Sequence, residues 1–340
     1  MTPDAVSSAG AGVAFGVDIG GTKVLGLALD DGDRVVGEAR VPTPKGPSRA
    51  AHNGSEVADA IAEVVGQLDS QVHASRSAGA GAPGIGIGAP GMLDREGRLR
   101  FSPNLPQADG VDWRVLMRAR LAGRRVLIEN DANFAVLAEH RLGAARSYRY
   151  VVMVTLGTGI GGGIVMDGRV QVGGNGFAGE IGHMVVDPAG PPCPCGRRGC
   201  WERYASGGGL GLLAREAALA GNLPGVVALA GGDPESVRGE DVTAAALAGD
   251  APARDVVEQV GWWVGFGLAN LACAFDPECF VLGGGLVGAG DLLLDATRTA
   301  YAQLVEGGAT RPATAIVPAT FGERAGAVGA ALAARQGGLW

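Results

Sequence analysis

Three cysteines and a histidine form the most specific residue pattern in this sequence. Cys193, Cys195 and Cys200 lie within one octet, and His183 precedes Cys193 by ten positions. Three thiolates and one imidazole are a common tetrahedral ligand set for Zn²⁺. Four protein ligands leave no open coordination position, so the sequence predicts a structural zinc ion rather than a catalytic one. Such an ion would fix the polar loop around it.

Two glycine-rich turns could hold phosphate groups. In the first turn, apolar residues 13–17 and Asp18 precede Gly20-Gly21-Thr22-Lys23, and a second apolar segment follows. The second turn is the run LGTGIGGG at 156–163. The spacing GxxxxGK[ST] is absent, and a strand follows where a P-loop would begin a helix. We expect hairpins whose backbone N–H groups cradle phosphate, with Asp18 near Mg²⁺; ordinary hairpin turns are the alternative. Two such turns, each carrying a threonine, also indicate an internal duplication.

A polar pair lies where a predicted strand meets a predicted helix. Residues 124–130 (RRVLIEN) have the pattern of a buried strand, and Asp131 opens a helix that Gly143 closes. Ligands of open α/β sheets gather at this kind of junction, so Asn130 and Asp131 are candidate site residues. The alternative is that Asp131 only caps the helix.

Other segments are predicted from periodicity and from turn residues. Residues 55–68 and 255–275 have helical spacing, and GIGIG before the turn at 89–91 reads as a strand. A hairpin follows and ends in a loop with Asn104, a residue type that also serves simply to form turns. The strand CFVLGGG ends in three glycines, over which an adenine or ribose could lie. We expect Cys273 and Cys279 to be core thiols.

Composition excludes several classes of protein. The chain has 340 residues, 47% of them hydrophobic, and a net charge of −7 with no basic block. Nucleic acid is therefore not an expected partner. No apolar run has transmembrane length, and residues 1–12 look like a disordered leader rather than a signal peptide. An odd cysteine count with three clustered thiols suits a reducing compartment, so we expect a cytoplasmic protein that does not associate with membranes.

The motifs together resemble the ROK family of repressors, open reading frames and kinases. The runs that carry the resemblance are DIGGTK at 18–23, ENDAN at 129–133, LGTGIGGGIVMDGRVQVGGNGFAGEIGHM with CPCGRRGCWERYASG, DPE followed by VLGGG, and GERAGAVGAALAA. The resemblance covers the chain from Val13 onward, and it is strongest to the ATP-dependent bacterial glucokinases. It implies the actin-like ATPase and sugar kinase fold: two α/β domains with an active-site cleft between them and a structural zinc knuckle. The expected bounds are 13–140 for the first domain, with the final helix (324–340) packed on it, and 141–323 for the second, with the zinc motif at 183–200.

The resemblance also implies a role for each matching residue. Asp131 would be the base that takes a proton from a sugar hydroxyl, and His183 would bind zinc through one ring nitrogen and sugar through the other. The other expected sugar contacts are Asn130, Glu180, Glu202, Gly91 and Asn104. The residues expected at the phosphates of Mg-ATP are Asp18, Gly20, Gly21, Thr22, Lys23, Thr158 and Gly159. Gly283 and Gly284 would lie beside adenosine.

The implied activity is ATP-dependent phosphorylation of glucose to glucose 6-phosphate by a homodimer or homotetramer. A kinase for fructose, mannose, N-acetylglucosamine or N-acetylmannosamine is the runner-up, and polyphosphate is an alternative donor. ROK repressors carry a helix-turn-helix domain ahead of the sugar-binding body. Only about a dozen residues without helical periodicity precede the first predicted strand here. A DNA-binding function is therefore disfavoured, and a non-catalytic sugar sensor is disfavoured because Asp131 and both glycine loops are present.

Overall fold

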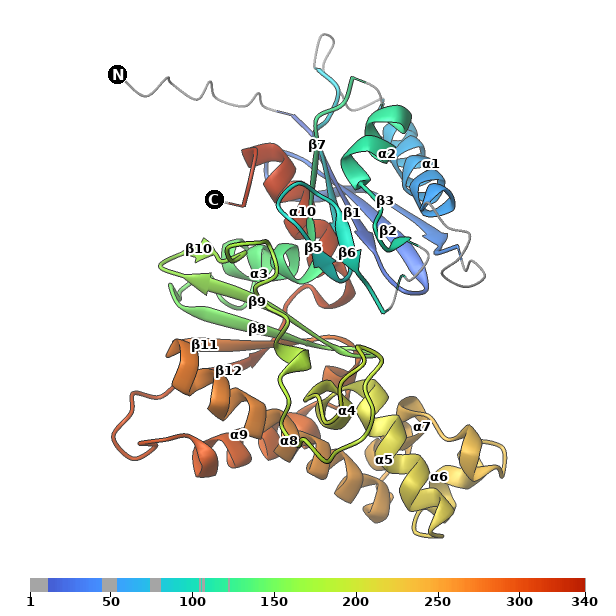
Figure 1. The fold of residues 1–340 in the computed structure, drawn as a ribbon, viewed down its shortest axis with the longest axis vertical. Coiled ribbons are helices and arrows are strands. Elements are labelled where there is room, and N and C mark those ends of the chain that lie inside the picture. The colour runs from blue at the N-terminus through green and yellow to red at the C-terminus, as the bar shows by residue number, and fades with distance from the viewer. Residues whose placement is uncertain are drawn as a thin grey trace. The chain divides into compact units, whose positions relative to one another are not determined.

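The fold is that of a computed structural model that describes residues 12–44, 54–73, 81–103, 105, 108–121 and 123–339. The chain forms two compact units (Figure 1). The first contains the described residues up to Arg146, residues 163–179, and the described residues from Arg324 onward. The second contains residues 147–162 and 180–323. The domain bounds expected from the sequence stay a prediction.

The first unit is built on a five-stranded sheet with the order β3-β2-β1-β4-β7. Its strands are β1 (Ala14–Ile19), β2 (Lys23–Leu29), β3 (Val35–Pro42), β4 (Ile85–Ala89) and β7 (Val126–Asn130). The first three form an antiparallel meander, whereas β1, β4 and β7 are parallel. Parallel strands end at the same edge of a sheet, so Asp18 near the end of β1 and Asp131 just after β7 come to one edge.

Small residues allow two helices to lie directly on this sheet. The helices of the unit are α1 (Ser55–Val72), α2 (Trp113–Arg120), α3 (Asp131–Arg141) and α10 (Ala325–Gln336). A Cβ on Gly16 would lie 1.8 Å from the carbonyl oxygen of Ala327 in α10, and one on Gly26 would lie 2.2 Å from Val64 Cγ1 in α1. Gly26 pairs with Val17, the neighbour of Gly16, so α10 and α1 cover opposite faces.

The second sheet repeats the strand order of the first. It runs β10-β9-β8-β11-β12, with β8 (Val151–Leu156), β9 (Ile160–Met166), β10 (Arg169–Val170), β11 (Cys279–Gly283) and β12 (Ala315–Pro318). As in the first sheet, the strand with the glycine turn after it (β8) pairs in parallel with a later strand (β11). A repeated topology is what an internal duplication would leave. A short hairpin of β5 (Met92–Leu93) and β6 (Leu99–Phe101) stands apart from both sheets.

The helices of the second unit pack around its own core. They are η3 (Ile181–His183), α4 (Glu202–Ala205), α5 (Gly207–Leu219), α6 (Pro224–Leu229), η4 (Pro234–Ser236), α7 (Gly239–Leu247), α8 (Ala251–Phe275), η5 (Gly285–Ala289) and α9 (Asp291–Leu304). A last short turn, η6 (Gly322–Arg324), leads into α10. None of the helices in the described parts of the chain has both the length and the apolar character needed to cross a membrane.

Candidate functional site

Two carboxylates meet at the edge of the first sheet. Asp18 on β1 pairs with Gly88 on β4, and Asp131 is the first residue of α3. A Cβ on Gly88 would lie 3.3 Å from the Cα of Asp131 and 3.3 Å from Oδ1 of Asp18. A bare glycine therefore separates the two acids, and a side chain at position 88 would fill the space between them.

The surroundings of both acids disfavour their charged forms. The pKa of Asp18 is raised to about 8, mainly by burial and also by the nearby charge of Asp131, while Lys23 opposes both effects. Burial also raises the pKa of Asp131 to about 6, while the backbone N–H of Ala132 lowers it. Oδ1 of Asp18 is buried and accepts no hydrogen bond from any residue that the structure describes. A buried carboxylate oxygen without a donor suits a hard cation, so the residues present fit Mg²⁺ at Asp18.

The cap of α3 is Asn130, not Asp131. Its Oδ1 accepts hydrogen bonds from the N–H groups of Ala132 (2.9 Å) and Asn133 (3.2 Å), and its Nδ2 donates to the carbonyl of Gly91 (3.1 Å). Oδ1 of Asp131 also accepts from Ala132. The alternative that Asp131 serves only as a cap is therefore wrong. Asn130 fixes the helix start, and a catalytic role for Asp131 stays a prediction.

The first glycine loop is a tight hairpin turn tied down by Thr43. The N–H of Gly20 donates to the carbonyl of Lys23 (2.9 Å), which closes the turn. The hydroxyl of Thr43 donates to the carbonyl of Gly20 (2.6 Å), and its N–H donates to the carbonyl of Thr22 (3.0 Å). Thr43 thus binds the carbonyl oxygens of Gly20 and Thr22. Because these oxygens are already hydrogen-bonded to Thr43, they should repel a phosphate bound at the loop less strongly. Sequence reasoning missed Thr43, because no local pattern shows which loop it reaches.

Replacing Thr43 by valine should raise the KM for ATP by about threefold to tenfold, the range for loss of one hydrogen bond. The KM for sugar should stay within about twofold, because the nearest effect is on the phosphate loop. Thr43→Ser keeps the hydroxyl and should behave like the unmodified protein. Steady-state kinetics on the three proteins decide the matter: an equal rise in both KM values, or a serine variant as impaired as the valine variant, would contradict the assigned role.

The second glycine loop is held in a similar way within the second unit. The N–H of Gly157 donates to the carbonyl of Gly159 (3.0 Å), and the N–H of Gly207 donates to the carbonyl of Gly157 (2.8 Å). The hydroxyl of Ser206 lies between two carbonyls, 2.6 Å from that of Glu202 and 3.1 Å from that of Thr158. A Cβ on Gly159 would lie 2.4 Å from Oε2 of Glu202. Glycine at 159 therefore leaves room for a predicted sugar contact beside the predicted phosphate loop.

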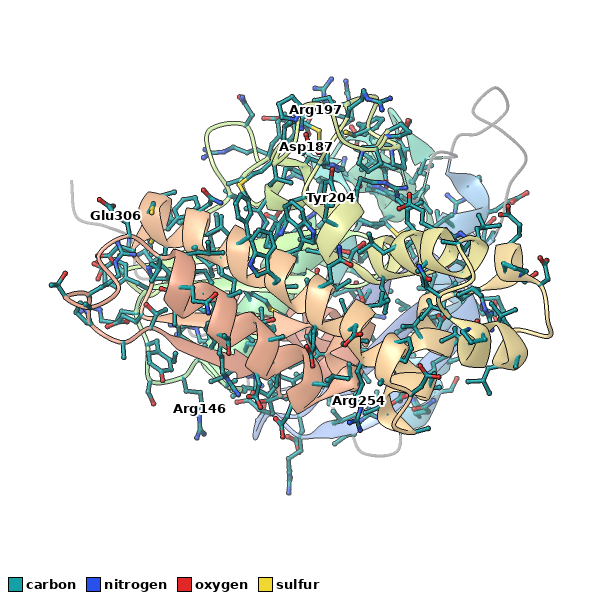
Figure 2. All side chains as sticks on the ribbon, turned by 90° about the horizontal axis from the view of Figure 1, so that it is seen from below. Arg146, Asp187, Arg197, Tyr204, Arg254 and Glu306 are labelled. Carbon is teal, nitrogen blue, oxygen red and sulfur yellow. The ribbon has the colours of Figure 1, made fainter. Side chains whose placement is uncertain are left out.

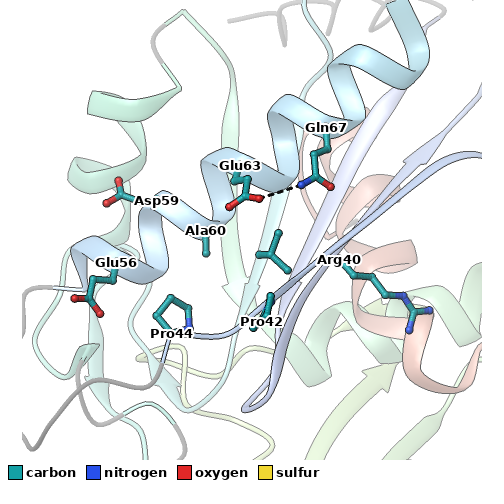
Figure 3. A pocket seen from close by; sticks show the side chains of 9 residues that line it. Arg40, Pro42, Pro44, Glu56, Asp59, Ala60, Glu63 and Gln67 are labelled. Atoms are coloured by element: carbon teal, nitrogen blue, oxygen red, sulfur yellow. Dashed lines mark hydrogen bonds between the residues drawn. The ribbon is translucent and has the colours of Figure 1, made fainter.

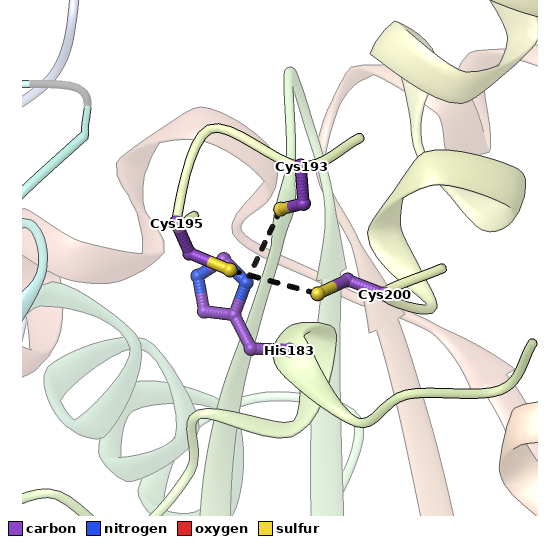
Figure 4. A group of neighbouring side chains, drawn as sticks. All are labelled: His183, Cys193, Cys195 and Cys200. Atoms are coloured by element: carbon purple, nitrogen blue, oxygen red, sulfur yellow. Dashed lines mark hydrogen bonds between the residues drawn. The ribbon is translucent and has the colours of Figure 1, made fainter. Parts of the chain in front are cut away.

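The four predicted zinc ligands lie together in the second unit (Figure 4). Their ligand atoms are all within 4.8 Å of one another. The sulfurs of Cys195 and Cys200 are 3.6 Å apart, and Sγ of Cys193 is 3.7 Å from Nδ1 of His183. Tetrahedral Zn–S bonds of about 2.3 Å would place two sulfurs about 3.8 Å apart. The cluster therefore fits Zn²⁺ with little movement.

His183 has a different neighbour on each ring nitrogen. Nδ1 faces the cysteine cluster, whereas Nε2 is 3.9 Å from Oε2 of Glu180. Oε1 of Glu202 is 3.7 Å from Nδ1 of His183 and 3.0 Å from Sγ of Cys193. The zinc cluster, Glu180 and Glu202 thus surround one imidazole, and only Nε2 is directed away from the metal position. This arrangement suits binding of metal through Nδ1 and of a ligand hydroxyl through Nε2.

Comparison with known proteins settles the family. The ROK family profile matches residues 14–337. The chain belongs to the ROK family. The glucokinase of Streptomyces coelicolor is 39% identical over 335 residues, which cover 96% of this chain and 98% of that protein. A ROK glucokinase of Streptomyces griseus, solved in complex with glucose and AMPPNP, has a TM-score of 0.83 at 37% identity and covers 96% of this chain and 100% of its own. The xylose repressor of Bacillus subtilis is 28% identical, over 94% of this chain and 76% of the repressor.

Family membership confirms the predicted α/β sugar kinase fold and the resemblance to glucokinases. The Cys₃His cluster of this ROK protein fits the structural zinc ion predicted from sequence. The roles of individual site residues stay predictions, and Asn104 lies outside the described residues. The family's kinases act on a sugar and a phosphoryl donor, which agrees with the chemistry that the acids and glycine loops favour.

Two glycines predicted to approach adenosine have a structural reason of their own. Gly284 has φ +86°, and a Cβ there would lie 2.5 Å from the backbone of Leu156 at the end of β8. A Cβ on Gly283 would lie 2.9 Å from Cε of Met153. Packing of β11 against β8 therefore requires glycine at 284, and contact with a nucleotide there stays a prediction. The expectation that Cys273 is a core thiol is wrong, since it is exposed on α8, whereas Cys279 is buried.

One open hollow of about 450 Å³ lies on the first unit (Figure 3). Arg40 of β3 and the acids Glu56, Asp59 and Glu63 of α1 supply its charged lining. Glu63 accepts a hydrogen bond from Gln67 (3.1 Å). None of these residues belongs to the predicted site, and side chains spread along one helix face are typical of a solvated surface.

Proposed function

We propose that this ROK protein is an ATP-dependent glucokinase that converts glucose to glucose 6-phosphate. The observation that carries the proposal is the carboxylate pair of Asp18 and Asp131, in a chain with nearly full-length similarity to glucokinases. Phosphoryl transfer requires positioning, a divalent cation and a base, all of which these two acids and the glycine loops would supply.

Asp131 acts as the base in this proposal. The 6-hydroxyl of glucose gives its proton to the Asp131 carboxylate as the hydroxyl oxygen bonds to the γ-phosphorus. The bond between that phosphorus and the β,γ-bridging oxygen breaks, and ADP leaves. Asp18 would help to hold Mg²⁺, which neutralises charge on the phosphates when bound. The backbone N–H groups of the two glycine loops would hold the phosphate oxygens.

The remaining sugar hydroxyls would bind to polar groups of the zinc loop. Glu180 and Glu202 offer acceptors, and a neutral His183 with zinc on Nδ1 offers the Nε2–H as a donor. Each sugar hydroxyl both donates and accepts, so this set is suited to several neighbouring hydroxyls. Asn130, Gly91 and Asn104 would complete the site, with Gly283 and Gly284 beside adenosine.

The first experiment is a coupled ADP-release assay with Mg-ATP and five sugars: glucose, mannose, fructose, N-acetylglucosamine and N-acetylmannosamine. We expect the highest kcat/KM on glucose. Higher kcat/KM on another sugar would retain the kinase mechanism and replace the substrate. Silence on all five sugars, with sugar binding still seen by calorimetry, would overturn the ATP-dependent kinase; polyphosphate in place of ATP would then separate another donor from a sensor.

The catalytic rate should depend on pH through Asp131. Its folded-state pKa of about 6 lies above the usual value, and only the deprotonated carboxylate can accept a proton. The kcat/KM for glucose should therefore fall about tenfold per pH unit below about pH 6 and level off above it. A pH series with the coupling enzymes in excess measures this, and a flat profile from about pH 5 to pH 7 would contradict the base assignment.

A homodimer or homotetramer in the cytoplasm completes the proposal, on the strength of the family resemblance. Light scattering on the purified protein gives the subunit number directly. A monomeric mass at assay concentration would remove the oligomer from the proposal without touching the activity.

A further inference from the structure

Two aromatic side chains attach the segment around Glu202 to helix α8. Trp201 is fully buried, and its Nε1–H donates to the carbonyl of Trp263 (2.7 Å). The ring of Tyr204 packs on the ring of Trp263 with centroids 4.3 Å apart, and its hydroxyl donates to Oδ2 of Asp187 (2.9 Å; Figure 2). Glu202 therefore lies between two anchored neighbours.

The indole of Trp201 occupies space that is open only because residue 267 is glycine. A Cβ on Gly267 would lie 2.0 Å from Cε2 and 2.1 Å from Cζ2 of that ring. Gly267 and Trp263 are four residues apart on α8, so one helix face supplies both the empty space and the carbonyl acceptor. Glycine is unfavourable inside a helix, and here the close approach of a tryptophan ring explains its presence.

The anchored segment fixes the position of Glu202 relative to two predicted ligand positions. The backbone N–H of Trp201 donates to the carbonyl of Met184 (2.8 Å), one residue after His183. Oε1 of Glu202 is 3.7 Å from Nδ1 of His183, and Oε2 is 3.4 Å from the N–H of Ile160 at the second glycine loop. A shift of the Trp201 ring would move Cys200 and Glu202 with it, because both are its direct neighbours in the chain.

We propose that Trp201 and Gly267 are positioning residues for sugar binding. The indole of Trp201 fits the space at Gly267 on α8, and this fit holds the carboxylate of Glu202 in the position where it binds the sugar. The inference rests on the proposed function, because it assigns Glu202 to the sugar. A residue that served only the core would change stability and leave the KM for sugar alone. A positioning residue instead changes the KM for sugar, and changes it more than the KM for ATP.

The test compares two glycine-to-alanine changes in the same helix. Gly267→Ala places a methyl group in the indole ring. Gly261→Ala places one 2.6 Å from Cβ of Ala296 on α9, away from Trp201, and serves as the matched control. We expect Gly267→Ala to raise the KM for glucose about tenfold or more, the range for a misplaced charged hydrogen bond. The control should lose stability to a similar degree and keep its KM.

A second change makes the result independent of folding defects. In the double variant Gly267→Ala, Trp201→Phe, the smaller ring leaves room for the methyl group, and the KM for glucose should recover by at least about threefold. Trp201→Phe alone is compared with Trp262→Phe, at an exposed tryptophan of the same helix. Equal KM values for the Gly267 and Gly261 variants, or no recovery in the double variant, would overturn the proposal. The unmodified protein in the same assay tests the proposed function separately. If it does not phosphorylate glucose, the proposed function fails, and calorimetric sugar binding by the same variants still tests whether Trp201 and Gly267 position Glu202.

Discussion

Replacement of Asp131 by asparagine should lower kcat by about a thousandfold or more, while glucose still binds with nearly unchanged affinity. General bases contribute about a hundredfold to ten-thousandfold to enzymatic rates, and an amide cannot accept the proton. Asparagine has the shape of aspartate, and its Oδ1 can still accept the N–H of Ala132. The start of α3, capped by Asn130, should therefore be preserved.

The same change should also raise the melting temperature of the ligand-free protein. The charge of Asp131 raises the pKa of Asp18, so its removal lets Asp18 ionise more easily and bind Mg²⁺ at lower pH. Burial holds the folded-state pKa of Asp131 above its unfolded value. Ionisation of Asp131 above about pH 6 therefore opposes folding, and at pH 8 the asparagine variant should melt at a higher temperature.

Single-turnover phosphorylation and calorimetric glucose binding measure the two halves of this prediction. Glu139→Gln is the matched control, because Glu139 is a fully buried acid of the same helix that accepts the N–H of Ala144 (2.9 Å). That variant should keep kcat within about threefold, since glutamine retains the acceptor oxygen. Turnover by the asparagine variant within tenfold of the unmodified rate would remove Asp131 as the base.

Local patterns were sufficient to predict the parts of the site that one short segment forms. The hairpin around Gly20 follows from two apolar runs on either side of a glycine turn, and the zinc ligands follow from cysteine spacing. The junction at Asn130 and Asp131 follows from a buried strand that runs into a helix. In each case the signal and the structure lie within the same few residues.

Distant contacts decide what the sequence could not. Gly16 allows α10 to approach the sheet, Gly284 allows close packing on the end of β8, and Gly267 leaves space for an indole ring. In a glycine-rich sequence these three positions cannot be told apart from other glycines. Thr43 reaches its loop from the position just after β3. Cys273 was assigned to the core from residue type alone, but the face of α8 that carries it is exposed. Tertiary partners set these roles, and a single sequence does not list them.

Replacement of Cys195 by serine should release zinc and impair sugar binding much more than ATP binding. A hydroxyl is a poor zinc ligand, and three remaining ligands hold the ion far less tightly. The loop also has backbone hydrogen bonds of its own, from Gly199 to the carbonyl of Pro191 (2.8 Å) and from Val186 to the carbonyl of Gly199 (2.9 Å), but these two bonds do not hold the His183 imidazole. Metal binding at such sites supplies folding free energy directly, so loss of the ion should free the loop.

A freed loop would affect sugar recognition because His183 belongs to both sites. Without the ion, Nδ1 of His183 no longer coordinates a metal, and Nε2 and the neighbouring Glu180 lose their fixed orientation. The KM for glucose should rise at least about tenfold, and the melting temperature should fall. Asp18 and the first glycine loop lie in the other unit, and the cluster is linked to the second loop through Glu202, so the KM for ATP should rise less than the KM for glucose.

Metal analysis of the purified proteins, together with both KM values, tests this prediction, and the chain offers its own control. Cys273→Ser removes an exposed thiol outside the cluster and should keep one zinc ion per chain with unaltered kinetics. A zinc-free Cys195→Ser protein with full activity would show that the ion has no part in sugar recognition. Loss of zinc from the Cys273 variant as well would show that thiol loss in general, rather than loss of one ligand, had disturbed the fold.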